Sequence, residues 1–179
     1  ECFYERDDVL FTSIHADHRS WGEWHPQTGL PEEVGTGLGE GYNINIPLPH
    51  GAGDESYSYV FSNVIDPVVT AYDPDVILVS AGQDPGLMDP LARNAVTKPG
   101  FEMLGQRVRQ LADRTANGNL AVIQEGGYHL SHLAFATLGV LEGVLDLETD
   151  VRHDPFAWMD GENLGGTVTA VHNAGRVVS

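Results

Sequence analysis

Hydrophobic residues recur along the chain in two spacings, one typical of strands and the other of helices. Residues 9–15 and 42–46 are rich in β-branched and aromatic types, which predicts a strand in each segment. Residues 75–80 and 120–123 are nearly continuous apolar runs, and such runs are typical of parallel strands that are buried on both faces. The chain is therefore expected to contain two strands near its start and two further along.

Helices are predicted where apolar residues recur every three or four positions. The first extends for about 19 residues from Asp54, and Pro67 is expected to kink it. Thr97 can cap a second helix, and a third, over about residues 130–146, is apolar on several sides, which predicts that it lies inside the molecule. The order β, β, α, β, α, β, α predicts an α/β fold with a mostly parallel sheet flanked by helices.

Composition and short patterns exclude several classes of function. The chain has 179 residues, a length typical of one domain, and a net charge of −17, whereas nucleic-acid binding needs a basic face. The alternating glycines of residues 35–41 lead into a strand, so they predict a tight turn and not a dinucleotide site. No Gly-x-Ser-x-Gly motif of a serine hydrolase occurs, and no apolar run approaches the roughly 20 residues that span a bilayer. We therefore expect a soluble, cytoplasmic protein, and Cys2 alone excludes an intrachain disulfide.

Residues with chemical potential follow three of the predicted strands. Ser13 and His15 end the first strand, Asp84 follows the third, and Tyr128 follows two glycines after the fourth. In such folds ligands bind at the carboxyl ends of the strands, so these side chains are expected to share one rim of the sheet. A plainer interpretation exists for two of them, because Asp is a common turn residue before Pro-Gly and a loop tyrosine can have a packed ring.

Six motifs occur in the order in which a known family carries them. They are RDDVLFTSIH (6–15), GEGYNINIPLP (39–49), GDE (53–55), ILVSAGQD (77–84), DPLAR (89–93) and EGGY (125–128). Over residues 3–146 the chain thus resembles the arginase-like amidohydrolases, which include histone deacetylases, acetylpolyamine amidohydrolases and acetoin-utilisation proteins. It is most similar to the class II-like prokaryotic members.

The resemblance implies an arginase-like three-layer sandwich that is incomplete at its N-terminal side. Residues 1–150 would be the carboxyl-terminal part of a deacetylase domain, and residues 151–179 an extension or tail. The family's Asp-x-His zinc ligands and its adjacent catalytic histidines would lie upstream of the first residue. The chain would then supply one metal ligand, and by itself it is expected to have little activity.

The resemblance also implies the chemistry of Asp84 and Tyr128. Asp84 would be a ligand of Zn²⁺ or another divalent transition metal, and zinc with an open position lowers the pKa of bound water toward about 7. Tyr128 would be the catalytic hydroxyl that stabilises the oxyanion, since a neutral phenol can donate to developing negative charge. The substrate would be an N-acetylated amine such as acetyl-lysine or an acetylpolyamine.

Other residues of this chain match positions at which the family binds potassium ions or substrate. Ser13 and the carbonyl of Ile14 match one potassium site. The residues that match a second potassium site are Phe3, Arg6, Val9 and Tyr42. The residues that match the substrate channel are Trp24, His25, Leu87, Met88, Gly126 and Gly127. Ordinary packing and turn geometry explain the same residue types without an ion or a substrate.

Two departures from the family pattern lie beside Asp84. Gln83 stands where an aromatic residue is more usual, and Pro85-Gly86 replaces the more frequent Ala-His or Ala-Ser. These changes bear on the mouth of the channel and hence on the substrate. They leave the predicted ligand in place.

Other interpretations remain open. The chain could be a non-catalytic binding module that keeps the fold without a complete metal site. His15, His18 and His25 with Asp17 could form an independent metal site, although the first two lack the regular spacing on one face that such sites use. A homo-oligomer is compatible with the sequence.

The charge of −17 predicts a salt-dependent stability. A solvated acidic surface, of the kind found in proteins of salt-loving microbes, is the simpler interpretation, and attraction of cationic substrates is the other. Like charges repel in the folded state, and salt screens them over a Debye length of about 10 Å at about 0.1 M. We expect the thermal midpoint to rise from low to molar potassium chloride. A constant midpoint would contradict both the self-repulsion and the salt-loving interpretation.

Overall fold

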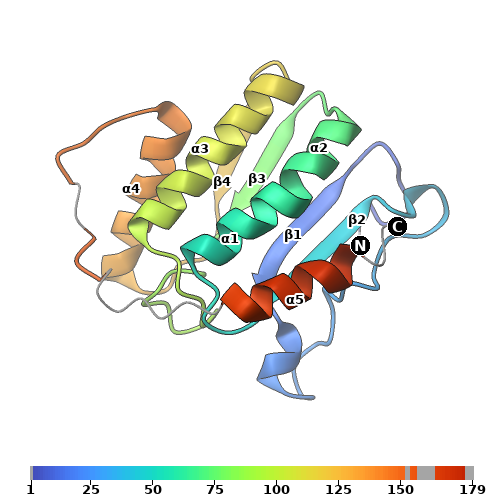
Figure 1. The fold of residues 1–179 in the computed structure, drawn as a ribbon, viewed down its shortest axis with the longest axis horizontal. Helices are drawn as coiled ribbons and strands as arrows, with labels where there is room; N and C mark the ends of the chain where they lie inside the picture. Colours follow the sequence, from blue (N-terminus) through green and yellow to red (C-terminus); the bar gives the residue numbers. More distant parts are fainter. Residues whose placement is uncertain (1, 152–153, 157–163, 176–179) are drawn as a thin grey trace.

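Parallel strand pairs flanked by helices form the described part of the chain (Figure 1). A computed structural model describes residues 2–151, 154–156 and 164–175. Strand β1 (Phe11–Ala16) pairs with β2 (Asn43–Leu48), and β3 (Ile77–Ala81) pairs with β4 (Leu120–Gln124), both in parallel. The predicted strands and their parallel pairing are confirmed.

The sheet is not continuous in this part of the chain. Within the described residues the strands form two separate two-stranded sheets, because no described strand bonds to both pairs. In the second sheet Ala81 lies opposite Gln124, so both strands end together and the loops that follow them leave from one edge. In Figure 1 the arrows of β1 and β3 point the same way, as expected if the carboxyl ends face one side.

The long helix predicted from Asp54 is interrupted before Pro67. It consists of α1 (Asp54–Val60), a π-helical turn (Phe61–Ile65) and α2 (Asp66–Tyr72). The Asp66 N–H bonds to the carbonyl of Phe61, five residues back. Proline has no N–H to donate and its ring crowds the preceding turn, so the wider π turn accommodates it. The predicted disturbance at Pro67 is therefore present as a π turn.

The core lies between β2, the α1–α2 segment and α3 (Lys98–Thr115). Thr97 caps α3 as predicted, since its side chain accepts a hydrogen bond from the Gly100 N–H. Helix α5 (Leu164–Gly175) contacts β2 and α1 and contributes Val171 to the core. The sequence did not predict this helix, because glycines weaken its apolar repeat, and the remaining residues of the expected extension lie partly outside the described ones.

Three predictions about burial are wrong. Strands β3 and β4 were expected to be covered on both faces, yet Leu78 is 68% exposed and Ile123 is 46% exposed. Helix α4 (Leu130–Leu145) was expected to lie inside the molecule, yet Leu130 is 84% exposed. The physical reason is the same in all three cases: within the described residues each element finds a packing partner on one face only.

A buried ion pair joins α3 to α4. Lys98, the chain's single lysine, is 3% exposed and bonds to Glu142, which is 4% exposed. Glu142 also accepts a hydrogen bond from Thr149, and the Lys98 N–H donates to Asp154. Burial raises the pKa of Glu142, but the hydrogen bonds from Lys98 and Thr149 lower it by more, so its pKa lies below the ordinary value. Lys98 and Glu142 therefore connect α3 with α4, and both helices with Thr149 and Asp154 after α4.

Removing Lys98 should destabilise the protein. Lys98→Met leaves Glu142 buried without its partner, which typically costs about 3–5 kcal/mol of unfolding free energy. Adding Glu142→Leu should recover most of that loss. The pair's stabilisation should be present above the pKa of Glu142 in the unfolded chain, and should be lost as pH falls through its lower folded value.

Urea unfolding at several pH values would measure these effects. Arg114→Met is the matched control, because Arg114 pairs with Asp66 at the surface at 3.2 Å, where such a bond contributes little. Equal losses from Lys98→Met and Arg114→Met, or no recovery in the double variant, would contradict the assignment.

Candidate functional site

Asp84 lies in a niche formed by the backbones of two loops. The loop after β3 bonds to the loop after β4 through the Gln83 N–H, which donates to the Gly126 carbonyl at 2.9 Å. A side chain at Gly126 would collide with the Asp84 carboxylate, because its Cβ would lie 2.5 Å from Oδ1. A Cβ at Gly82 would overlap the same oxygen. Glycine is therefore needed at both places for the carboxylate to occupy this niche.

The Asp84 carboxylate has no cationic partner among the described residues. Burial raises its pKa, a backbone hydrogen bond lowers it by less, and the negative charge of Asp89 adds a small further rise. No lysine, arginine or histidine of the described chain forms an ion pair with it. A half-buried, unpaired carboxylate fits the oxygen ligand of a cation. The described residues contain no group of three or more metal-ligating side chains, so Asp84 could be one ligand of a site but not a whole one.

Tyr128 is presented to solvent by the neighbouring loop. Its side chain is 57% exposed, which does not agree with the interpretation of a packed loop ring. Gly127 before it has a φ of 131°, and a Cβ there would lie 2.6 Å from the Leu133 side chain. The Asp84 carboxylate touches Gly126, two residues before Tyr128, so the two predicted site residues belong to adjoining loops on one rim.

Gln83 forms an amide pair behind the site. It is 3% exposed, and its Oε1 accepts a hydrogen bond from Gln124 at 3.2 Å. Gln124 also donates to the Glu125 carbonyl at 2.7 Å, which fixes the start of the Tyr128 loop. The residue that replaces the usual aromatic thus supports this loop through hydrogen bonds.

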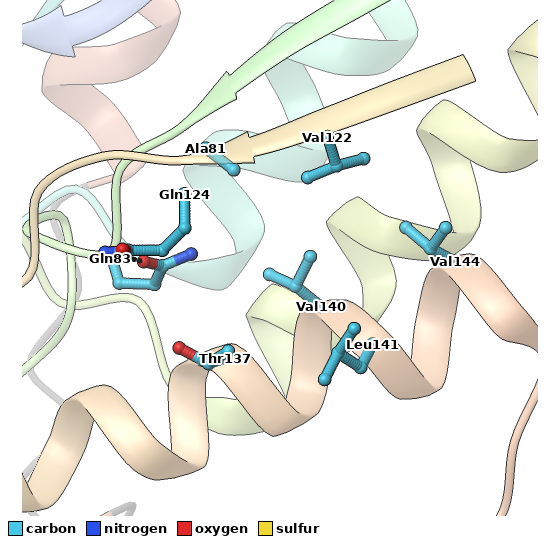
Figure 2. A pocket seen from close by; sticks show the side chains of 8 residues that line it. All are labelled: Ala81, Gln83, Val122, Gln124, Thr137, Val140, Leu141 and Val144. Atoms are coloured by element: carbon cyan, nitrogen blue, oxygen red, sulfur yellow. Dashed lines mark hydrogen bonds between the residues drawn. The ribbon is translucent and has the colours of Figure 1, made fainter.

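An apolar pocket of about 120 Å³ lies beside this amide pair, between the β3–β4 sheet and α4 (Figure 2). The residues that line it are Ala81, Gln83, Val122, Gln124, Thr137, Val140, Leu141 and Val144. Leu87 and Met88, the predicted channel walls on this side, are not among them. The pocket is therefore separate from the predicted acyl channel.

The predicted histidine site is not supported. Ser13 Oγ lies 2.9 Å from Nδ1 of His15, and Nε2 of the same ring lies 2.9 Å from the Gly29 carbonyl, so both ring nitrogens are engaged. The His15 and His18 rings are 5.2 Å apart and the His18 and His25 rings 5.0 Å apart. These residues pack as a cluster of rings, and the described chain contains no metal-ligating group there.

The two sides of the predicted channel are connected by Arg93. Trp24 is 78% exposed and its ring packs edge-on against His25. Trp21 stacks on the same histidine, and the Arg93 guanidinium lies 4.4 Å from the Trp21 ring. Arg93 belongs to the loop that follows Asp84, so it brings the tryptophan segment to that loop. Nothing in the spacing of the residues predicted this contact.

The residues expected to bind potassium lie within β1 and in the segments that lead into β1 and β2. The carbonyl of Phe3 accepts a hydrogen bond from the Arg6 N–H at 3.0 Å, and that of Tyr42 accepts one from Phe11 at 2.9 Å. The Arg6 guanidinium is held by Asp8 at 2.6 Å. Val9 and Ile14 are half-buried next to and within β1. The potassium roles stay predictions.

No helix in the described ranges is long and apolar enough to cross a membrane.

Sequence comparison gives the family context of these loops. Residues 1–144 match the family described as "Histone deacetylase domain". The chain is 39% identical over 173 residues to histone deacetylase 8 of Arabidopsis thaliana, covering 97% of this chain and 46% of that protein. It is 35% identical over 154 residues to a histone deacetylase-like amidohydrolase of Pseudomonas aeruginosa, covering 86% of this chain and 39% of the relative. The chain thus spans less than half the length of these relatives.

Solved structures agree in fold. The HD domain of HDA15 superposes with a TM-score of 0.81 at 30% identity, covering 99% of this chain and 46% of that one. The histone deacetylase Clr3 gives a TM-score of 0.82 at 26% identity, covering 98% of this chain and 28% of that one. The arginase-like α/β fold expected from the sequence is confirmed.

Gly126→Ala should disturb the Asp84 carboxylate with little effect on folding. The backbone at Gly126 is not in the left-handed region, so alanine fits its conformation. The group that must move to make room for the new Cβ is the Asp84 carboxylate, at the end of a side chain. If Asp84 is a metal ligand, zinc affinity of the full-length protein should fall about 10- to 100-fold, as for other changes next to a ligand. The thermal midpoint of the metal-free protein should change little.

Thr70→Ala is the control, because Thr70 is exposed on α2 and lies outside the site. Unchanged zinc affinity in Gly126→Ala, measured by competition with a chelator, would mean that the Asp84 carboxylate is not bound to the metal.

Proposed function

This chain belongs to the histone deacetylase family, and from that premise we propose that it is part of a zinc-dependent enzyme that removes acetyl groups from N-acetylated amines. The observation that carries the proposal is the unpaired Asp84 carboxylate beside the loop that presents Tyr128. The substrate class is acetyl-lysine, an acetylpolyamine or a similar small acetamide, since all of these present the same amide.

Asp84 would hold the metal ion through its carboxylate, within the niche that Gly82 and Gly126 leave open. Zinc bound there would polarise the acetyl carbonyl and lower the pKa of a bound water. Because the niche is half-buried, Asp84 is shielded from bulk water, and electrostatic attraction to a cation is stronger in such surroundings. The chain's part in metal binding would thus be one pre-positioned oxygen ligand.

Tyr128 would act on the carbonyl oxygen from the other loop. Tyr128 is 57% exposed, and its hydroxyl would donate a hydrogen bond as that oxygen gains negative charge. Water would add to the carbonyl carbon, and cleavage of the amide C–N bond, with a proton from that water passed to the leaving nitrogen, would release acetate and a free amine. Ser13 and Ile14, on β1, would bind a potassium ion that supports the same rim.

A non-catalytic binding module is the second candidate, and it is favoured by the finding that the described residues lack a group of three metal ligands. Metal analysis distinguishes the two proposals. The enzyme hypothesis expects about one zinc per full-length protein, lost in Asp84→Asn. A binding module would retain no stoichiometric zinc in the wild type.

Tyr128→Phe should lower the turnover of acetyl-lysine peptide by the full-length protein. Loss of one oxyanion donor typically reduces kcat by about 10²–10³-fold. Because Tyr128 is mostly exposed, the thermal midpoint and zinc content should stay close to those of the wild type.

Tyr72→Phe is a matched control, since its hydroxyl bonds to the Asp7 carbonyl at 3.3 Å and lies outside the site. Near-normal kcat in Tyr128→Phe would remove the tyrosine from the reaction and would refute this part of the proposal.

A further inference from the structure

Asp89 connects the loop that carries Asp84 to the backbone of Tyr128. It is 8% exposed, and its Oδ2 accepts a hydrogen bond from the Tyr128 N–H at 2.6 Å. Its Oδ1 accepts one from the Leu91 N–H at 2.9 Å. Both carboxylate oxygens are therefore used, and Asp89 is a bridge between two loops.

The backbone around Asp89 is itself fixed. The Asp89 N–H donates to the Gly86 carbonyl at 2.9 Å, which closes a turn. The same segment is bonded to Val96: the Leu87 N–H donates to the Val96 carbonyl at 2.9 Å, and the Val96 N–H donates to the Pro85 carbonyl at 3.1 Å. Gly86 and Val96 thereby form a parallel β-bridge. The carboxylate is consequently held by a loop whose position is set by several hydrogen bonds.

Tyr128 needs such support because little else holds it. Its side chain is mostly exposed, and Gly127 before it has a backbone conformation that only glycine adopts readily. Helix α4 begins only at Leu130. The Tyr128 N–H donates to a carboxylate, and a hydrogen bond to a carboxylate is about twice as strong as a neutral one.

We propose that Asp89 is a positioning residue for Tyr128: by holding the tyrosine's backbone N–H, it fixes the phenol relative to the Asp84 loop. This inference rests on the proposed function, in which Tyr128 contacts the substrate. A displacement of about 1 Å at such a group can reduce the rate about 10²-fold. A carboxylate suits the task because it offers one oxygen to Leu91 and the other to Tyr128, whereas asparagine has a single acceptor oxygen.

The test is a double-mutant cycle of Asp89→Asn and Tyr128→Phe in the zinc-loaded full-length protein. Asp89→Asn alone should lower kcat for an acetyl-lysine peptide by about 10- to 10²-fold, with KM and zinc content nearly unchanged. In the Tyr128→Phe background the same change should alter kcat by no more than about twofold, because the hydroxyl that Asp89 positions is then absent.

A second readout follows the hydrogen bond directly. Hydrogen exchange at the Tyr128 amide should be slow in the wild type and faster in Asp89→Asn. Asp89→Glu keeps both acceptor oxygens on a longer side chain, so its kcat should lie between the wild type and Asp89→Asn, and it serves if the asparagine variant folds poorly. Asp113→Asn removes the same charge from an exposed site on α3 and should change neither rate nor exchange.

The outcomes separate the inference from the proposed function. Equal losses from Asp89→Asn with and without the Tyr128 hydroxyl would overturn the positioning role, as would an unchanged kcat in Asp89→Asn. Near-normal kcat in Tyr128→Phe would instead refute the catalytic role of the tyrosine itself. A loss that disappears in the Tyr128→Phe background, with faster exchange at the Tyr128 amide, would support the inference.

Discussion

Parallel pairing of β3 with β4 is the constraint from which the candidate site follows. The two strands end opposite each other, at Ala81 and Gln124. One further hydrogen bond, from the Gln83 N–H to the Gly126 carbonyl, keeps the chains together after the strands have ended. An acid on one loop and a phenol on the other are thereby brought to the same rim. Antiparallel strands would have put these loops at opposite edges of the sheet.

The strands, the cap at Thr97 and the region of the site could be predicted because they depend on neighbours in the sequence. Apolar runs indicated the strands, and the connections by helices indicated parallel pairing. Apolar spacing indicates which residues can be buried, but not whether a partner covers them. For that reason the burial of β3, β4 and α4 was predicted wrongly. Leu78 and Leu130 have the composition of core residues and are exposed within the described chain.

The contacts that sequence analysis missed join distant residues. Asp89 and Tyr128 are 39 positions apart, and Lys98 and Glu142 are 44 apart. In each case an acidic side chain was assigned no role, because aspartate and glutamate are common on an acidic surface and their types say nothing about their partners. Only the folded arrangement distinguishes a bridging carboxylate such as Asp89 from the surrounding solvated ones.

A side chain such as that of Tyr128 can be both exposed and fixed in position only if its backbone is held rigidly. Tyr128 lies between β4, which is paired with β3, and α4, which the Lys98–Glu142 pair fastens to α3. Glycines at the α3–α4 contact let the helices approach closely, since a Cβ on Gly139 would lie 2.6 Å from the Lys98 carbonyl. Both ends of the tyrosine loop are therefore anchored in packed structure. The phenol itself can remain free of packing and open to a substrate. Among the described residues Asp84 has no lysine or arginine partner, which would stabilise the fold but occupy the carboxylate oxygens.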